Sequence, residues 1–210
     1  MDESLKLMLR EARILPTVTL HTVEETMALG RILQEAGYPC LEILLRSPFT
    51  WEALSLLRQH FPELKVGVGT LLTLEELREA HAAGAAFGVS PGLDLDLFRS
   101  AHALGFPYLP GISTPTELMQ LRQVRGTIAK VFPAGALGSQ YLAQMATAFA
   151  AMTFVPSGGL HSDNWREFAA LTQVLCLSGS WILPKDFAST PDSQTLVTSL
   201  KTLRDGAFVV

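Results

Sequence analysis

The chain has 210 residues, of which 48% are hydrophobic and 17% are charged, and its formal net charge is −4. This composition predicts a folded protein with a large core, and the negative charge disfavours nucleic acid as a partner. The first residues are acidic where a signal peptide needs basic ones, and the longest apolar stretch, residues 145–155, is too short to span a bilayer. We therefore expect a cytoplasmic protein with no membrane partner.

Eight short β-prone segments recur along the chain, with centres roughly 19 to 26 residues apart, as expected for one βα unit per step. They cover residues 14–20, 40–45, 65–69, 86–90, 107–110, 127–132, 153–156 and 174–177. Helical patterns are found at residues 3–11, 23–36, 50–60, 74–83, 94–104, 115–124, 139–151 and 193–204.

Local signals mark several helix boundaries. Thr22 with Glu25, and Thr73 with Glu76, have the spacing of a capping box at a helix start. Three helical patterns are followed by a glycine that predicts the helix end, at Gly37, Gly84 and Gly105.

The segments are apolar throughout and each is followed by a helix, which predicts a parallel sheet covered on both faces. Eight such units fit a closed (β/α)8 TIM barrel with an extra N-terminal helix. The alternative is a doubly wound open sheet, which would require a glycine-rich turn after the first strand, where Leu20, His21 and Thr22 stand. No linker divides the chain, so we expect one domain over residues 1–210.

Lys130 stands in an otherwise uncharged, apolar run, residues 127–133, and is one of only five lysines. Lysine is almost never fully buried unless it is paired, and loss of hydration favours the neutral amine. A neutral amine attacks carbonyl carbons, so this position is a candidate for Schiff-base chemistry. The alternative is a structural lysine whose stem is buried and whose ammonium reaches water.

Glu42 also lies within an apolar strand, residues 40–45, so its carboxylate needs a partner or a chemical task. It is a candidate general acid/base, and the alternative is an ion pair with Arg46 four residues later. Arg46 itself could bind a substrate carboxylate with two hydrogen bonds.

Glycine-rich turns follow the seventh and eighth strands, in Ser157-Gly158-Gly159 and Ser178-Gly179-Ser180. The loops after these strands often bind phosphate in barrels, and exposed backbone amides suit an anion. No metal-ligand spacing appears, so we expect no metal site. Cys40 and Cys176 each lie in an apolar segment and are interpreted as packing residues.

Seven short motifs, in this order, resemble those of the bacterial 2-keto-3-deoxy-6-phosphogluconate (KDPG) and 4-hydroxy-2-oxoglutarate (KHG) aldolases. They are LEILLR (41–46), GVGT (67–70), VSPG (89–92), PGISTPTEL (110–118), KVFPA (130–134), PSGG (156–159) and GSW (179–181). The resemblance implies a class I aldolase, a carbon–carbon lyase with no metal or other cofactor, assembled as a homotrimer of barrels. It also implies that Lys130 is the Schiff-base lysine and Glu42 the acid/base.

The remaining site residues follow from the same resemblance. Arg46 and Thr70 match residues that hold the pyruvyl carboxylate, while Pro91 and Phe132 match residues that line the pyruvate pocket. The phosphate and the far end of the substrate are assigned to Ser157, Gly158, Gly159, Gly179 and Ser180.

Three positions depart from the family pattern. Ser157 stands where threonine is frequent, Gly135 replaces an acidic residue found in some members, and Leu44 occupies a threonine position. None removes a reacting group, so they bear on the aldehyde half of the substrate.

The resemblance implies reversible cleavage of KDPG to pyruvate and glyceraldehyde 3-phosphate, and of KHG to pyruvate and glyoxylate. The alternatives are the galactonate epimer of KDPG as substrate, a non-covalent phosphate-binding isomerase or synthase, and a non-catalytic binding protein.

Overall fold

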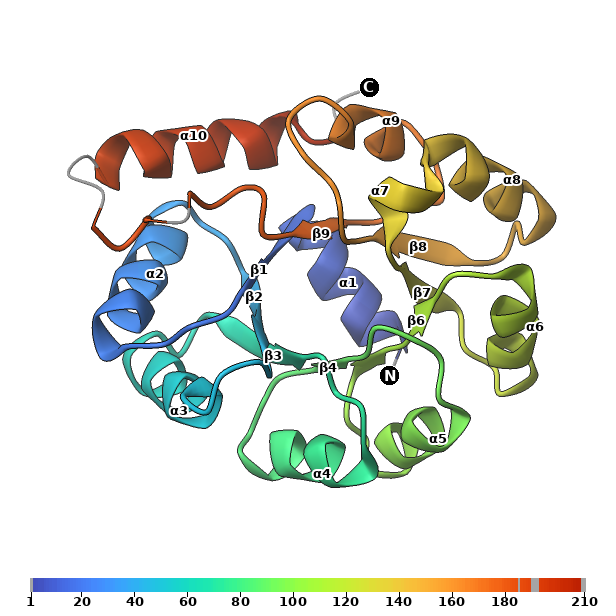
Figure 1. Ribbon diagram of the computed structural model, residues 1–210, viewed down its shortest axis with the longest axis horizontal. Coiled ribbons are helices and arrows are strands. Elements are labelled where there is room, and N and C mark those ends of the chain that lie inside the picture. Colours follow the sequence, from blue (N-terminus) through green and yellow to red (C-terminus); the bar gives the residue numbers. More distant parts are fainter. Residues whose placement is uncertain (1, 185, 190–192, 209–210) are drawn as a thin grey trace.

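The computed structural model describes residues 2–184, 186–189 and 193–208, and its strands form a closed parallel ring (Figure 1). One sheet has the order β5-β4-β3-β2-β1-β9 and the other the order β6-β7-β8. Isolated bridges, Phe154 to Val174 and Ser157 to Ser178, join β8 to β9. The strands are β1 (Ile14–Val18), β2 (Cys40–Leu44), β3 (Lys65–Gly69), β4 (Gly88–Val89), β5 (Tyr108–Leu109), β6 (Gly111–Ile112), β7 (Ile128–Val131), β8 (Thr153–Pro156) and β9 (Leu177–Gly179).

The predicted (β/α)8 barrel is confirmed, and its fifth and eighth strands differ in detail from the prediction. The fifth position is divided into β5 and β6 at Pro110, whose carbonyl accepts a hydrogen bond from the Lys130 amide at 2.9 Å. The eighth strand was predicted at residues 174–177 but lies at Leu177–Gly179, because its partner β1 begins only at Ile14, opposite Leu177. Val174 and Cys176, before Leu177, are buried without extending this ladder.

Helices surround the ring on its outside, except α1, which lies across the ring in the view of Figure 1. Two short helices, α7 and α9, were not predicted. The helices are α1 (Asp2–Ala12), α2 (Val23–Glu35), α3 (Thr50–His60), α4 (Leu74–Ala82), α5 (Leu95–Ala103), α6 (Pro115–Gln123), α7 (Ala134–Leu137), α8 (Ser139–Ala148), α9 (Trp165–Ala169) and α10 (Ser193–Gly206). In the part of the chain that the structure describes, none of them is long and apolar enough to cross a membrane.

The predicted helix signals are mostly confirmed. Thr73 and Glu76 form the full capping box of α4. The Thr22 side chain accepts from the Glu25 amide, but the Glu25 carboxylate accepts from the His21 amide instead of closing the box. Positive φ angles of 72°, 80° and 66° follow α2, α4 and α5, at Gly37, Gly84 and Gly105.

An apolar layer fills the interior of the barrel near the N-terminal ends of the strands and packs against Leu5 and Leu9 of α1. Helix α1 therefore covers the end of the barrel at which the strands begin. Both cysteines are free, buried thiols in this layer, which confirms them as packing residues, and burial raises the pKa of each thiol. The layer includes Leu15, Cys40, Ile128, Val155 and Cys176.

Candidate active site

A layer of polar side chains lies next to the apolar layer inside the barrel, nearer the C-terminal ends of the strands. Side chains alternate between the two faces of a strand, so residues two positions apart face the same side. Each member of the polar layer stands two positions after a member of the apolar layer, and each is buried. The members are Thr17, Glu42, Lys130, Ser157 and Ser178.

Lys130 and Glu42 form a buried ion pair in this layer. The Lys130 Nζ lies 3.2 Å from Glu42 Oε1, and the two residues are 6% and 0% exposed. A side chain at Gly69 would collide with the Glu42 carboxylate, so glycine at this position makes room for the pair. Among the described residues Glu42 Oε2 has no hydrogen-bond partner.

The structure bears on the alternatives for these residues. Lys130 is only 6% exposed and its ammonium is paired with the buried Glu42 carboxylate, so it is not a lysine whose charged end lies at the protein surface. Arg46 is exposed and forms no ion pair with Glu42 in the described structure, so that alternative is also wrong. The partner of Glu42 comes instead from β7, on the opposite side of the ring from β2. A pairing of this kind leaves no local spacing in the sequence.

Lys130 lines a cavity of about 130 Å³ at the C-terminal ends of the strands. Its amine lies 5.8 Å from the centre of the Phe132 ring. Eight of the eleven predicted site residues line the cavity; Glu42 is not a lining residue but is paired with one, Lys130. The lining residues are Thr17, Leu44, Arg46, Lys130, Phe132, Ser157, Gly158, Gly159, Leu160, Gly179, Ser180 and Trp181.

Two predicted residues, Thr70 and Pro91, are not among the lining residues. Both follow strands on the same rim of the barrel, and their roles stay predictions. Thr70 has a φ of 67°, a left-handed conformation that is uncommon for a residue other than glycine. Such conformations persist where the surrounding structure holds them and are frequent at functional sites.

Four lining residues were missed: Thr17, Leu44, Leu160 and Trp181. Two of them carried a usable signal. Thr17 is a polar residue two positions after buried Leu15 on a strand, and Trp181 directly follows the second glycine-rich turn. The Trp181 ring stacks on Trp165, with centroids 6.1 Å apart and planes at 19°.

The first glycine-rich turn presents free backbone donors. Gly158 and Gly159 have φ angles of 80° and 75°, and within the described part of the chain their amides donate to no backbone carbonyl. A side chain at Gly158 would collide with the Phe132 ring. The Gly135 amide donates to the Gly158 carbonyl at 2.8 Å, and a side chain at Gly135 would collide with the Gly159 carbonyl. The departure at Gly135 thus lets α7 pack closely on the turn.

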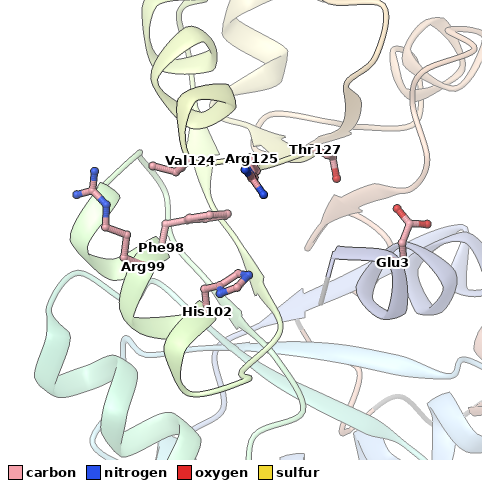
Figure 2. Close-up of a pocket in the computed structure, with 7 residues that line it drawn as sticks. All are labelled: Glu3, Phe98, Arg99, His102, Val124, Arg125 and Thr127. Atoms are coloured by element: carbon pink, nitrogen blue, oxygen red, sulfur yellow. The ribbon is translucent and has the colours of Figure 1, made fainter.

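A larger hollow of about 500 Å³ lies away from this cavity, between α5, the loop after α6 and the start of α1. Figure 2 shows Arg125 and His102 on one side of it and Glu3 on the other. It contains no member of the polar layer and lies near Thr127, at the end where β7 begins. No group of three His, Cys, Asp or Glu side chains among the described residues is arranged to hold a metal ion.

Comparisons with known proteins identify the family of this chain. The family model of KDPG and KHG aldolases matches residues 5–199. A 2-dehydro-3-deoxy-phosphogluconate aldolase of Treponema pallidum is 36% identical over 198 residues, which cover 93% of this chain and 94% of that protein.

Two solved structures are also similar. A KDPG aldolase of Legionella pneumophila, with pyruvate captured as a covalent carbinolamine intermediate, has a TM-score of 0.89 and 29% identity, covering 94% of this chain and 96% of that one. The aldolase of Zymomonas mobilis ZM4 with 3-phosphoglycerate has a TM-score of 0.90 and 29% identity, covering 99% and 97%. The chain belongs to the KDPG and KHG aldolase family.

Proposed function

We propose that this protein is a class I aldolase that reversibly cleaves KDPG into pyruvate and glyceraldehyde 3-phosphate, and KHG into pyruvate and glyoxylate. The observation that carries the proposal is the buried pair of Lys130 and Glu42, 3.2 Å apart, where a small cavity opens at the strand ends. A buried amine beside a proton acceptor is what covalent attack on a ketone requires.

The first step is capture of the keto acid. Arg46 binds the substrate carboxylate and so brings the C2 ketone toward Lys130, as Thr70 does from the neighbouring strand end. Glu42 accepts a proton from the Lys130 ammonium, and the neutral amine adds to C2 to give a carbinolamine. Glu42 returns this proton to the carbinolamine hydroxyl, which leaves as water, so that the iminium ion forms and Glu42 is again a carboxylate. Orientation of this kind contributes several kcal/mol, up to about 7–11 in well-aligned intramolecular reactions.

The second step is cleavage of the carbon–carbon bond. Glu42, directly or through a water molecule, removes the proton of the C4 hydroxyl, and the aldehyde carbonyl forms as the C3–C4 bond breaks. The bonding electrons pass to the iminium, which becomes an enamine, so the substrate adduct itself is the electron sink and no cofactor is required. Protonation of the enamine at C3 and hydrolysis then release pyruvate and regenerate Lys130.

The two halves of the substrate meet different parts of the site. The pyruvyl half lies beside Lys130, with Phe132 and Pro91 as its apolar walls. The phosphate of the aldehyde half binds at the glycine-rich turns, where backbone amides and one hydroxyl donate to the anion. These donors are Gly158, Gly159, Gly179 and Ser180.

Borohydride reduction in the presence of pyruvate tests the proposal. Peptide mass mapping should find a reduced pyruvyl adduct on Lys130 in the wild-type protein and none in Lys130→Met. The matched control is Lys201→Met, at an exposed lysine of α10, which should trap pyruvate like the wild type. Folded wild-type protein that forms no adduct with excess pyruvate would instead favour a non-covalent phosphate-binding barrel.

Substrate choice is tested by measuring kcat/KM for KDPG, its galactonate epimer and KHG with the same preparation. The galactonate epimer is the alternative substrate, and a higher kcat/KM for it than for KDPG would show that the epimer is the preferred substrate.

We also propose that residues 1–210 form one domain and that the enzyme works as a homotrimer in the cytoplasm. Two buried free thiols suit a reducing compartment. Light scattering after size-exclusion chromatography should give three times the mass of the chain.

A further inference from the structure

Two serine hydroxyls meet where the barrel closes between β8 and β9. The Oγ atoms of Ser157 and Ser178 lie 3.3 Å apart, and an isolated parallel bridge pairs the two residues. Ser157 lines the Lys130 cavity, whereas Ser178 is not among the lining residues and is 0% exposed. The enclosed serine can therefore reach a ligand only through its neighbour.

The protons of this pair can be assigned by counting partners. Each hydroxyl donates one hydrogen bond and accepts up to two, so the proton between the two oxygens can belong to either serine. Ser178 has no other side-chain partner among the described residues. If Ser157 supplied the shared proton, the Ser178 proton would be buried without an acceptor, which is costly. The favoured arrangement uses the Ser178 proton between the oxygens and leaves the Ser157 proton for the cavity.

The position of Ser157 indicates which part of a substrate would accept that proton. It stands directly before Gly158 and Gly159 in the chain, and all three line the cavity with Lys130. A substrate attached to Lys130 at C2, with its phosphate at the glycine turn, would place its aldehyde-derived carbons beside Ser157. Oxygen atoms on those carbons are hydrogen-bond acceptors.

We propose that Ser178 is a positioning residue that holds the Ser157 hydroxyl as a donor to the aldehyde half of the substrate. This inference rests on the proposed aldolase function. It predicts that Ser178 affects recognition of the aldehyde and leaves capture of pyruvate unchanged, because the pyruvyl half is bound elsewhere.

The test is steady-state condensation of pyruvate with glyceraldehyde 3-phosphate. Ser178→Ala should raise the KM for the aldehyde about 3-fold, and Ser157→Ala about 10-fold, as expected for one hydrogen bond. The KM for pyruvate and the rate of borohydride trapping should stay within about 2-fold of wild type. The double variant should have the same KM for the aldehyde as Ser157→Ala alone, because Ser178 acts only through Ser157.

The matched control is Thr26→Val, which removes a buried hydroxyl on α2 that donates to the Thr22 carbonyl at 2.8 Å, outside the cavity. It should leave the aldehyde KM unchanged. Additive losses in the double variant, or an unchanged aldehyde KM in Ser178→Ala, would overturn the inference. If Ser178→Ala does not fold, Ser178→Cys keeps nearly the same volume with a weak donor, and a wild-type aldehyde KM in that variant would equally overturn it.

Different results would contradict the aldolase function and the positioning role of Ser178. Wild-type protein that traps no pyruvate on Lys130 contradicts the aldolase function. Wild-type protein that traps pyruvate, with Ser178 variants of normal aldehyde KM, contradicts only the positioning role.

Discussion

The Lys130→Met variant measures what it costs to separate the buried ion pair. It leaves the Glu42 carboxylate, 0% exposed, without the ammonium that lies 3.2 Å from it in the wild type. An uncompensated buried charge of this kind typically costs about 3–5 kcal/mol of unfolding free energy. At about 2–4 °C per kcal/mol for a chain of this size, the melting temperature should fall by about 6–20 °C.

The double variant Lys130→Met/Glu42→Gln removes both charges and separates this cost from a general loss of packing. The free energy of unfolding of the double variant should lie within about 1 kcal/mol of the wild-type value, because neutral side chains of similar volume replace a buried pair at little cost. Urea unfolding followed by circular dichroism measures both variants, with Lys201→Met as the exposed control. A single variant as stable as wild type, or a double variant as unstable as the single one, would refute the reasoning.

Three further predictions concern other parts of the machinery. Glu42→Gln should still trap pyruvate on Lys130 but lower the cleavage rate by about 10²–10⁴-fold, measured in single turnovers; equal loss of both steps would make Glu42 a structural partner only. Gly135→Ala should displace the Gly159 carbonyl and raise the KM for phosphorylated aldehyde, while pyruvate trapping stays at its wild-type rate. Burial raises the pKa of Glu117, but hydrogen bonds from the two residues before α6 outweigh it and lower the pKa. The stabilisation is therefore present above the unfolded pKa of about 4.3 and lost as the pH falls through the lower folded value, so Glu117→Gln should flatten the acid limb of a stability–pH curve.

The fold was largely predictable because its signals are local. A buried parallel strand is apolar along its length, and Thr73 or Gly84 marks a helix boundary within a few residues. The misplaced eighth strand shows the limit of such signals, because apolar residues mark burial whereas the ladder begins where Ile14 of β1 is available as a partner.

The site was predictable one residue at a time but not as a set of contacts. Lys130 and Glu42 were identifiable separately as charges in apolar strands, yet their contact depends on the closure of the ring and on the space left by Gly69. Thr17 and Ser178 carry only a weaker signal, because hydroxyl residues are common in strands and the inward register alone gives these two a place in the polar layer.

The buried ion pair of the polar layer serves activity and not stability. Lys130 and Glu42 face inward one step above an apolar layer, at a level where hydrophobic side chains would pack without desolvating a charge. A buried ion pair is on average no more stabilising than a well-packed hydrophobic pair, so stability does not account for it. What the pair supplies is an amine and a proton acceptor at hydrogen-bonding distance beside an open cavity. Replacing both by Met and Leu should therefore give a barrel at least as stable as the wild type, measured by urea unfolding, and without any aldolase turnover.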